Sequence, residues 1–349
     1  MLKRKSKESV IKALEDAQKF IFTPFAFQAV GSMLDLGILK CLDAKPSEEK
    51  EIIKELNLNE YIVQTLLQIG VLNNIIQEKD GVFSLTKAGR MFLCDDMTIT
   101  NFNYVRDVCY LGASELTESF LKGQPKGLHK FLSKSKTIYP ALPHLPEKVK
   151  KSWYDFDHFY SDNCFNEVFN IVKSKYNSIY DIGGNTGKFE MLCLENDKNF
   201  DITLLDLSIN IENNKKNPKL KNCKFHSINV LDEKPNYPKF KNSAILMSQF
   251  LDCFSKDDIR KILTDISKNM DEDSAIYILE PYTDCQKYNG AEYSLAHISL
   301  YFTCMANGVS KMYSLKDMKD IIQKAGMKII QRYDSIGAFD YTLLECQKK

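Results

Sequence analysis

The pattern of apolar and polar positions changes character along the chain and predicts two domains joined by a helical segment. Apolar residues recur at helical spacing from Phe25 to Leu42, and two shorter helical patterns follow over 48–56 and 60–72. The turn Asp80-Gly81 within 74–86 predicts a β-hairpin. Three helices followed by a hairpin predict a winged helix within a mainly α-helical domain of residues 1–100.

Residues 101–175 are rich in aromatic side chains and helical in pattern, which indicates a connector that contributes to an active site. Beyond Lys175 strand and helix patterns alternate. The predicted strands cover 178–182, 202–207, 224–229, 244–248, 275–280, 328–333 and 341–346, with clear helices at 257–270 and 314–325. This alternation predicts an α/β domain over 176–349, with a doubly wound, mainly parallel sheet and an antiparallel finish.

Charge and composition exclude several classes of protein. The chain has 47 Lys and Arg against 46 Asp and Glu, whereas nucleic-acid binders usually carry a basic excess. The would-be recognition helix 60–72 has no Lys or Arg, so it offers no phosphate contacts. No apolar run approaches the ~20 residues of a membrane span, and the ten cysteines form no Cys-x-x-Cys pair. We therefore expect a cytoplasmic protein without a metal site, nucleic-acid partner or membrane contact.

The strongest chemical signal is the segment YDIGGNTGK, which starts at Tyr180, follows a predicted strand and opens a predicted helix. Its glycines allow a sharp turn and a close approach of the backbone to a ligand. The segment lacks the Gly-Lys-Ser/Thr of a phosphate P-loop. Asp206 ends the next strand about 20 residues later, where a carboxylate can accept both hydroxyls of a ribose. These features predict an adenosine-type ligand, and a tight turn without a ligand is the alternative.

These motifs resemble the S-adenosylmethionine-dependent O-methyltransferases of the plant caffeate and bacterial polyketide and hydroxyindole type. The segment DIGGNTG resembles their first cofactor motif, in which a third glycine commonly stands at the place of Asn185. Residues 36–39 and 83–90 resemble the family's N-terminal winged helix, which serves dimerisation. The resemblance covers nearly the whole chain. It implies a Rossmann-like methyltransferase domain, S-adenosyl-L-methionine as cofactor, a small-molecule methyl acceptor and a homodimer.

The resemblance also implies which side chains contact the cofactor. Asn229 stands where the family usually has an acidic residue beside the adenine, and Ser248 where some members have a lysine near the methionyl end. Phe156 and Tyr160 would lie over the sulfonium, or would simply pack the connector helix. The implied cofactor contacts are Asp181, Gly183, Gly184, Gly187, Asp206, Leu207, Asn229, Val230, Ser248, Phe156 and Tyr160.

The catalytic positions depart from the family's pattern. Aligning the helix around Ile262 places Asp252 where many relatives have the histidine that acts as general base, and Glu280 matches the residue that orients it. The Lys311–Met312 region replaces a second glutamate. A phenol with a pKa of about 10 suits a histidine better than an aspartate, unless burial or Glu280 raises the aspartate's pKa. Asp252 is therefore a base, a substrate-orienting residue or a structural residue, and His158 is the reserve base.

The acceptor side rests on the predicted helix 291–305, whose family counterpart lines the substrate pocket. His297, Phe302 and Met305 fall at acceptor-lining positions, or belong to the core. The predicted function is methyl transfer to an oxygen of a small aromatic or polyketide-like acceptor, with nitrogen or carbon also open. One alternative is a cofactor-binding protein with lost or altered catalysis. Another is a winged-helix regulator with a ligand-sensing domain.

Overall fold

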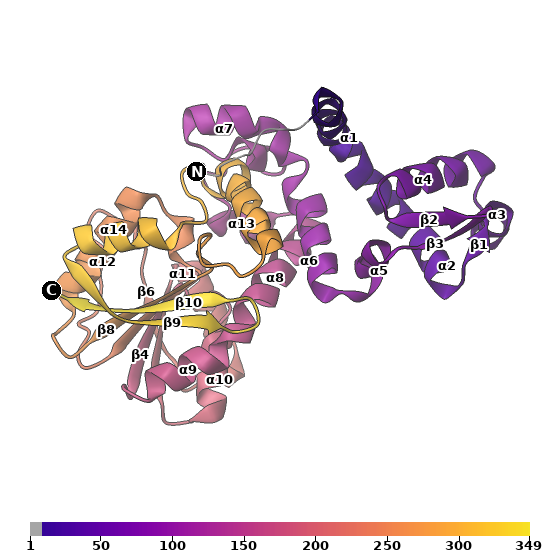
Figure 1. Ribbon diagram of the computed structural model, residues 1–349. Coiled ribbons are helices and arrows are strands. Elements are labelled where there is room, and N and C mark those ends of the chain that lie inside the picture. Colours follow the sequence, from indigo (N-terminus) through magenta and orange to yellow (C-terminus); the bar gives the residue numbers. More distant parts are fainter. Residues whose placement is uncertain (1–8) are drawn as a thin grey trace. The chain divides into compact units, whose positions relative to one another are not determined.

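The computed structural model describes residues 9–349, which divide into two compact units between Arg106 and Asp107 (Figure 1). The boundary expected at residue 100 falls inside helix α6 (Asp96–Tyr104). Almost all of the expected connector, 101–175, lies within the second unit. The helices of that segment are therefore part of the same compact body as the sheet.

The first unit is mainly helical and carries a small antiparallel sheet of order β1-β3-β2. The hairpin turn Asp80-Gly81 has positive φ at both residues, as tight two-residue hairpins require. The elements before α6 are α1 (Val10–Asp35), α2 (Ile38–Ala44), β1 (Ser47–Glu48), α3 (Glu49–Leu56), α4 (Glu60–Leu72), β2 (Ile76–Lys79), β3 (Val82–Leu85) and α5 (Lys87–Cys94). One aliphatic core, with Met33, Leu39, Ile52 and Leu67 among its buried members, joins these helices.

The helical pattern expected over 25–42 is two helices rather than one. Gly37 adopts a left-handed φ of 80° between α1 and α2, and the two helix axes differ by 64°. Glycine reaches that conformation without steric cost, which explains a break that apolar spacing alone does not reveal. Among residues 9–349, no single helix is long and apolar enough to cross a membrane, although the bent α1–α2 pair passes by length and composition.

The second unit is built on a seven-stranded sheet of order β6-β5-β4-β7-β8-β10-β9. The first five strands in this order are parallel, and β10 joins β8 and β9 antiparallel. The strands are β4 (Ser178–Ile182), β5 (Asp201–Asp206), β6 (Lys224–Ser227), β7 (Ala244–Ser248), β8 (Ala275–Glu280), β9 (Met327–Ile336) and β10 (Tyr341–Lys348). The predicted α/β class, with its antiparallel finish, is confirmed.

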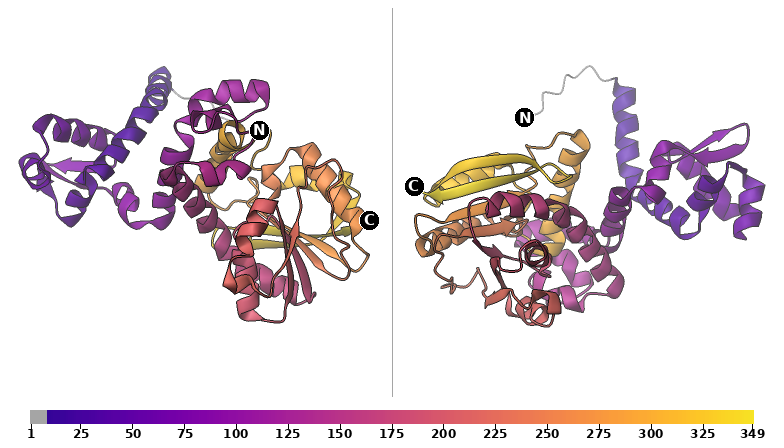
Figure 2. Two further views of the ribbon diagram at one scale, coloured as in Figure 1. Left: turned by 180° about the vertical axis from the view of Figure 1, so that it is seen from behind. Right: turned by 90° about the horizontal axis from the view of Figure 1, so that it is seen from below.

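Helices cover both faces of this sheet (Figure 2). Alternate residues of a strand face opposite sides, so Ile245 and Met247 of β7 join one core and Ala244 and Leu246 join the other. The helices are α7 (Leu116–Lys122), α8 (Glu147–Ser161), α9 (Phe165–Lys173), α10 (Lys188–Asn196), α11 (Ser208–Asn214), α12 (Lys256–Asn269), α13 (Asn289–Tyr301) and α14 (Leu315–Lys324). Residues of α12 and α14 belong to the first core, and residues of α9, α10 and α11 to the second.

Candidate functional site

A cavity of about 580 Å³ lies beyond the carboxyl ends of β4, β5 and β7. The chain leaves β4 toward β5 on one side and returns to β7 on the other, which makes this edge a topological switch point. Ligands of open α/β sheets bind at such points, and the volume suits a small-molecule site. All the lining residues belong to the second unit.

The glycine-rich turn between β4 and α10 forms one wall of this cavity. Gly183 has a φ of 87°, and a Cβ there would lie 2.3 Å from the Phe250 ring. Asn185 has a left-handed φ of 49°, which asparagine tolerates better than most residues, so it can replace a glycine here. Gly183 and Gly184 line the cavity, while Gly187 is buried and caps α10 with a φ of 73°. The turn therefore brings bare backbone to the cavity.

Asp206 lies at the end of β5, opposite the glycine turn. Its Oδ1 accepts from the Leu207 backbone N at 2.6 Å and from Asn210 Nδ2 at 3.0 Å. Its Oδ2 accepts from the Asn185 backbone N at 2.9 Å. A carboxylate has about four acceptor positions, so these contacts fix the group and leave capacity for a ligand hydroxyl. Burial raises the pKa of Asp206 against the lowering effect of these hydrogen bonds.

The residues expected around an adenine lie together at one end of the cavity. Leu207, Asn229 and Val230 all line it, and so does Leu231. The Asn229 side chain is engaged in its own turn, because Oδ1 accepts from the Leu231 backbone N at 3.1 Å and Nδ2 donates to Asp232 at 2.8 Å. This asparagine therefore shapes the loop as well as facing the cavity.

Two buried hydroxyl groups at the cavity have no hydrogen-bond partner among the described residues. They are Thr186 Oγ1 in the glycine turn and Ser248 Oγ at the end of β7. Buried polar atoms are almost always hydrogen-bonded in folded proteins, so a polar ligand would satisfy both. Together with Asp206 and the bare backbone of Gly183, they fit a cofactor that carries a ribose and an amino-acid group.

The helix α8 presents a different face to the cavity from the one expected. Phe156 and Tyr160 do not line it; their rings pack against each other at 4.9 Å, and Tyr160 packs on Phe339 at 4.9 Å. Trp153 and Tyr154 supply the aromatic surface instead. Residues three and four apart share a helix face, so Asp157, His158 and Ser161 line the cavity with them.

His158 faces the cavity and is held from behind by Asp162. His158 Nδ1 lies 3.3 Å from Asp162 Oδ1, and Lys188 Nζ lies 2.6 Å from Asp162 Oδ2. Burial raises the pKa of Asp162, but these two hydrogen bonds hold it below its ordinary value. Asp157, next to His158, accepts from Asn185 Nδ2 at 3.1 Å, and burial raises its pKa to about 6.

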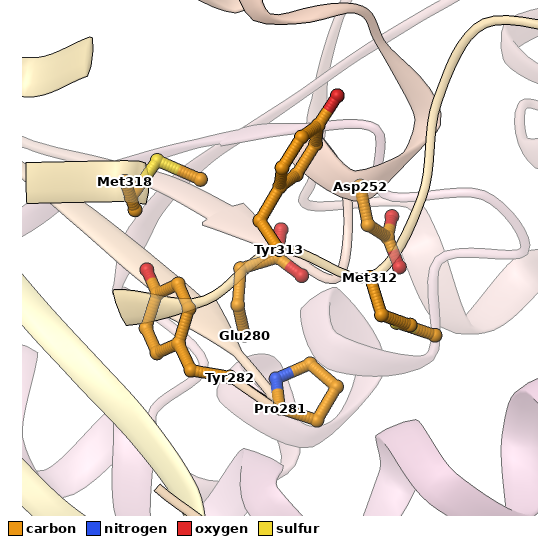
Figure 3. Close-up of a pocket in the computed structure, with 7 residues that line it drawn as sticks. All are labelled: Asp252, Glu280, Pro281, Tyr282, Met312, Tyr313 and Met318. Atoms are coloured by element: carbon orange, nitrogen blue, oxygen red, sulfur yellow. The ribbon is translucent and has the colours of Figure 1, made fainter. Parts of the chain in front are cut away.

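Asp252 and Glu280 lie behind the cavity wall rather than on it. They line a separate cleft, too small for a water molecule, with Met312 and Tyr313 (Figure 3). Glu280 is 3% exposed and accepts from the backbone N of Leu251 at 2.9 Å. Burial raises the pKa of Asp252 to about 7, and burial with the Asp252 charge raises that of Glu280 well above its ordinary value. Met312 gives the cleft an apolar wall.

The three expected acceptor residues do not reach the cavity. His297 is exposed on α13, with Nδ1 2.7 Å from the Tyr293 carbonyl oxygen. Phe302 and Met305 are buried in a π-helical turn, Phe302–Ala306, that follows α13. A π turn shifts the side-chain register of a helix, and here it directs Met305 against Gly112. Asn307 and Val309, just beyond the turn, line the cavity instead.

The remaining wall consists of residues that sequence reasoning missed. Tyr139 belongs to a short 3₁₀ segment, Tyr139–His144, and Cys253 and Phe254 follow β7. All three line the cavity with Gln249 and Asn307. No periodic pattern marks them, because they come from irregular segments. Within residues 9–349 we find no group of three or more His, Cys, Asp or Glu side chains that could hold a metal ion.

Known proteins match this chain in sequence and in fold. Residues 158–328 match the family model of the O-methyltransferase domain. O-methyltransferase 7 of Dictyostelium discoideum is 21% identical over 299 residues, 85% of this chain and 84% of that protein. The methyltransferase SibL superposes with a TM-score of 0.71 at 17% identity, over 96% of this chain and 99% of its own. The structure of human N-acetylserotonin methyltransferase in complex with S-adenosylmethionine superposes with a TM-score of 0.66 at 13% identity, over 99% of both chains.

The fold, the cavity at the switch point and the matched domain define one class of protein, the S-adenosylmethionine-dependent O-methyltransferases. Residues 158–328 belong to the O-methyltransferase domain family. The chain is an enzyme of this class, with S-adenosyl-L-methionine as its cofactor and a small molecule as its methyl acceptor.

Proposed function

We propose that the enzyme methylates a hydroxyl group of a small aromatic or polyketide-like acceptor, with Asp252 as the general base. One observation carries this proposal: a single cavity joins the glycine turn and Asp206 to a second wall of Tyr139, Phe254 and Asn307. The first wall suits the cofactor. The second combines aromatic surface with polar groups, which suits a flat acceptor with a hydroxyl group.

The cofactor, when bound, supplies a methyl group on a positively charged sulfonium. We propose that Gly183, Gly184 and Gly187 form the turn around its methionyl and ribose portions, with Asp206 on the ribose hydroxyls. Leu207, Asn229 and Val230 would flank the adenine, and Ser248 would donate to the methionyl end. Trp153 and Tyr154 would then take the place expected of Phe156 and Tyr160, over the sulfonium.

Methyl transfer is a direct displacement, so positioning supplies much of its acceleration. The protein must also accept the acceptor's proton. Asp252 suits this task because burial raises its pKa to about 7, which narrows the gap to a phenol near 10. Glu280 stays protonated beside it and is fixed by two backbone N–H groups, of Phe250 and Leu251. We therefore propose that Glu280 orients Asp252.

His158 is the second candidate for the base. Its ring faces the cavity and Asp162 holds one of its nitrogens, an arrangement that leaves the other nitrogen available. It lies on the cofactor side, however, because Asp157 on the same helix contacts Asn185 of the glycine turn, and Asp162, just after that helix, contacts Lys188 at the start of α10. Asp252, beside the acceptor wall, is therefore preferred.

We also propose that the first unit is a winged-helix dimerisation domain of a cytoplasmic homodimer. Helix α4 has no Lys or Arg for contacts to phosphate, and α1 exposes many large apolar side chains that a partner chain would cover. They are Val10, Ile11, Leu14, Phe20, Ile21, Phe22 and Phe25. Light scattering should give twice the chain mass for the wild type and for Gln18→Asp. A monomer is expected for Phe20→Asp, and a monomeric wild type would contradict the proposal.

The acceptor proposal is tested by following a radiolabelled methyl group from S-adenosylmethionine into a panel of catechols, hydroxyindoles and naphthols. Each phenol is paired with its amine analogue. We expect label in the phenols and little in the amines. Label confined to the amines would contradict O-methylation, and unmodified acceptors with cofactor binding intact would favour altered catalysis.

A further inference from the structure

Cys253 contacts the Asp252 carboxyl group and also lines the cavity. Cys253 lines the cavity, whereas Asp252 is 6% exposed and faces only the small cleft behind it. The Cys253 thiol donates to Asp252 Oδ1 at an S–O distance of 3.4 Å. Because the cleft cannot hold a water molecule, no solvent bridge can join Asp252 to an acceptor from that side. The Cys253 thiol is the contact of Asp252 that belongs to a cavity-lining residue.

The protein holds this thiol in place from several directions. Asn307 Nδ2 donates to the Cys253 carbonyl oxygen at 2.8 Å, and the Tyr139 hydroxyl hydrogen-bonds with the thiol. The Tyr313 hydroxyl donates to the carbonyl oxygen of Phe254 at 2.7 Å. The 3₁₀ turn Leu251–Cys253 is therefore anchored on both sides.

The same region of the cavity offers donors that lack a partner. Gln249 Nε2 and Ser248 Oγ are buried and unpartnered within the described part of the chain, although both residues line the cavity. Gln249 Oε1 accepts from the Tyr341 hydroxyl at 3.0 Å, which fixes the amide and leaves Nε2 toward the cavity. A polar group of a bound cofactor or acceptor would satisfy these buried donors.

The electrostatics suit a thiol that passes a proton without ionising. Burial and the Asp252 charge raise the pKa of Cys253 well above its ordinary value, so its S–H remains a donor. The titratable groups around Asp252 are Glu280 on β8, Tyr282 just after it, Tyr313 before α14, Tyr341 on β10, Tyr139, Cys253 itself and Asp157 on α8. Glu280 and the tyrosines stay neutral because burial raises their pKa values, so Asp252 is the carboxyl of the cleft that ionises first.

We propose that Cys253 is a catalytic residue that relays the acceptor's proton to Asp252. The inference rests on the proposed role of Asp252 as base. As the acceptor oxygen bonds to the methyl carbon, the S–CH₃ bond breaks and its electron pair stays on the cofactor sulfur. The acceptor proton moves to Cys253 Sγ while the thiol proton moves to Asp252 Oδ1. The thiol is restored, and after the product leaves Asp252 passes its proton back through the thiol to solvent that enters the cavity.

The kinetic test compares Cys253→Ala, Cys253→Ser and Asp252→Asn on the phenol of the panel with the highest turnover. We expect Cys253→Ala to lower kcat about 100-fold, the low end for general acid–base catalysis, with an unchanged Kd for S-adenosylmethionine. Cys253→Ser should recover part of the loss, because a hydroxyl can also relay a proton. The wild-type rise in kcat near pH 7 should be absent in Cys253→Ala. Cys94→Ala, at an exposed cysteine of the first unit, is the control.

The double variant separates the relay from the base. If Cys253 acts through Asp252, Cys253→Ala added to Asp252→Asn should lower kcat no further. If Asp252→Asn loses kcat while Cys253→Ala keeps the wild-type kcat, the relay through Cys253 is overturned but Asp252 remains the base. Wild-type kcat in Asp252→Asn would overturn the base itself.

A second measurement needs no acceptor. The infrared S–H stretch of Cys253 is isolated by subtracting the spectrum of Cys253→Ala from that of the wild type. We expect a band lowered by hydrogen bonding at pH 8, and a move to higher frequency in Asp252→Asn. A band that is the same in both proteins would show that the thiol does not donate to Asp252, which would overturn the relay.

Discussion

The carboxyl groups of Asp181 and Glu190 meet beneath Gly184, under the floor of the cofactor turn. A Cβ on Gly184 would lie 2.6 Å from Glu190 Oε1 and 3.0 Å from Asp181 Oδ2. Both carboxyls are buried, and burial raises the pKa of Asp181 to about 7 and that of Glu190 well above its ordinary value. The pair therefore holds a proton at neutral pH, and its charge lies directly below the bound cofactor's expected position.

This pair makes the stability of the protein depend on pH. Since both folded-state pKa values are raised, the unfolded chain loses these protons first. The protonated carboxyls of Asp181 and Glu190 make their full contribution to the free energy of unfolding below about pH 4. That contribution is lost as the pH rises toward 7 and beyond. Glu190→Gln removes one titrating group, so we expect its Tm to exceed that of the wild type increasingly between pH 5 and 8, as measured by calorimetry. Glu195→Gln, exposed on the same helix, should follow the wild type; equal slopes for Glu190→Gln would contradict the assignment.

Gly184→Asp should abolish most cofactor affinity. The new side chain would meet the Glu190 and Asp181 carboxyls and would add a third carboxyl group there. We expect Kd for S-adenosylmethionine to rise at least about 100-fold, or about 2.8 kcal/mol. Gly290→Asp is the matched control, because no heavy atom lies within 4 Å of its Cβ position. Unchanged affinity in Gly184→Asp would refute the placement of the cofactor.

Asp206→Asn should weaken cofactor binding while leaving the fold intact. The amide keeps one oxygen acceptor but loses the charge that strengthens bonds to ribose hydroxyls, a loss of about 1.5–3 kcal/mol. We expect a 10- to 100-fold higher Kd by titration calorimetry, since about 1.4 kcal/mol is tenfold. Asp201→Asn, at the exposed start of the same strand, should bind normally. Equal Kd values for the two variants would remove Asp206 from the site.

The two candidate bases give opposite outcomes. With Asp252 as base, wild-type kcat/KM should rise with pH through about 7, because the carboxylate is the active form. In Asp252→Asn this rise should be absent, and kcat should fall about 100-fold or more. His158→Gln should change kcat only slightly. The reverse result, with the large loss in His158→Gln, would transfer the role to His158.

Periodic features of the sequence predicted the structure well, and irregular ones did not. Apolar runs bounded by turn residues correctly predicted the strands that contain Asp181 and Asp206. The face of α8 that lines the cavity is about one residue out of phase with the expected one, since Phe156 packs against Tyr160 while Trp153 and Tyr154 line the cavity. The sequence pattern predicts that a helix forms, but it does not determine which face of the helix turns toward the neighbouring elements.

Local departures from regular helix caused the other differences. The left-handed Gly37 divides one expected helix into two. The π turn Phe302–Ala306 takes Met305 into the core, so that Asn307 faces the cavity in its place. Glu190 stands in the first turn of α10, and nothing in the sequence marks it as the buried neighbour of Asp181. Such contacts depend on tertiary packing, which spacing along the chain does not encode.

The central claim, a methyltransferase whose cofactor lies on the turn from Gly183 to Gly187, is tested most directly by titration calorimetry with S-adenosylmethionine. We predict saturable binding of one cofactor per chain in the wild type and in Gly290→Asp, and its loss in Gly184→Asp. The demethylated product, S-adenosylhomocysteine, should bind the same site and compete. Absence of binding by both ligands to the folded wild-type protein would contradict the account.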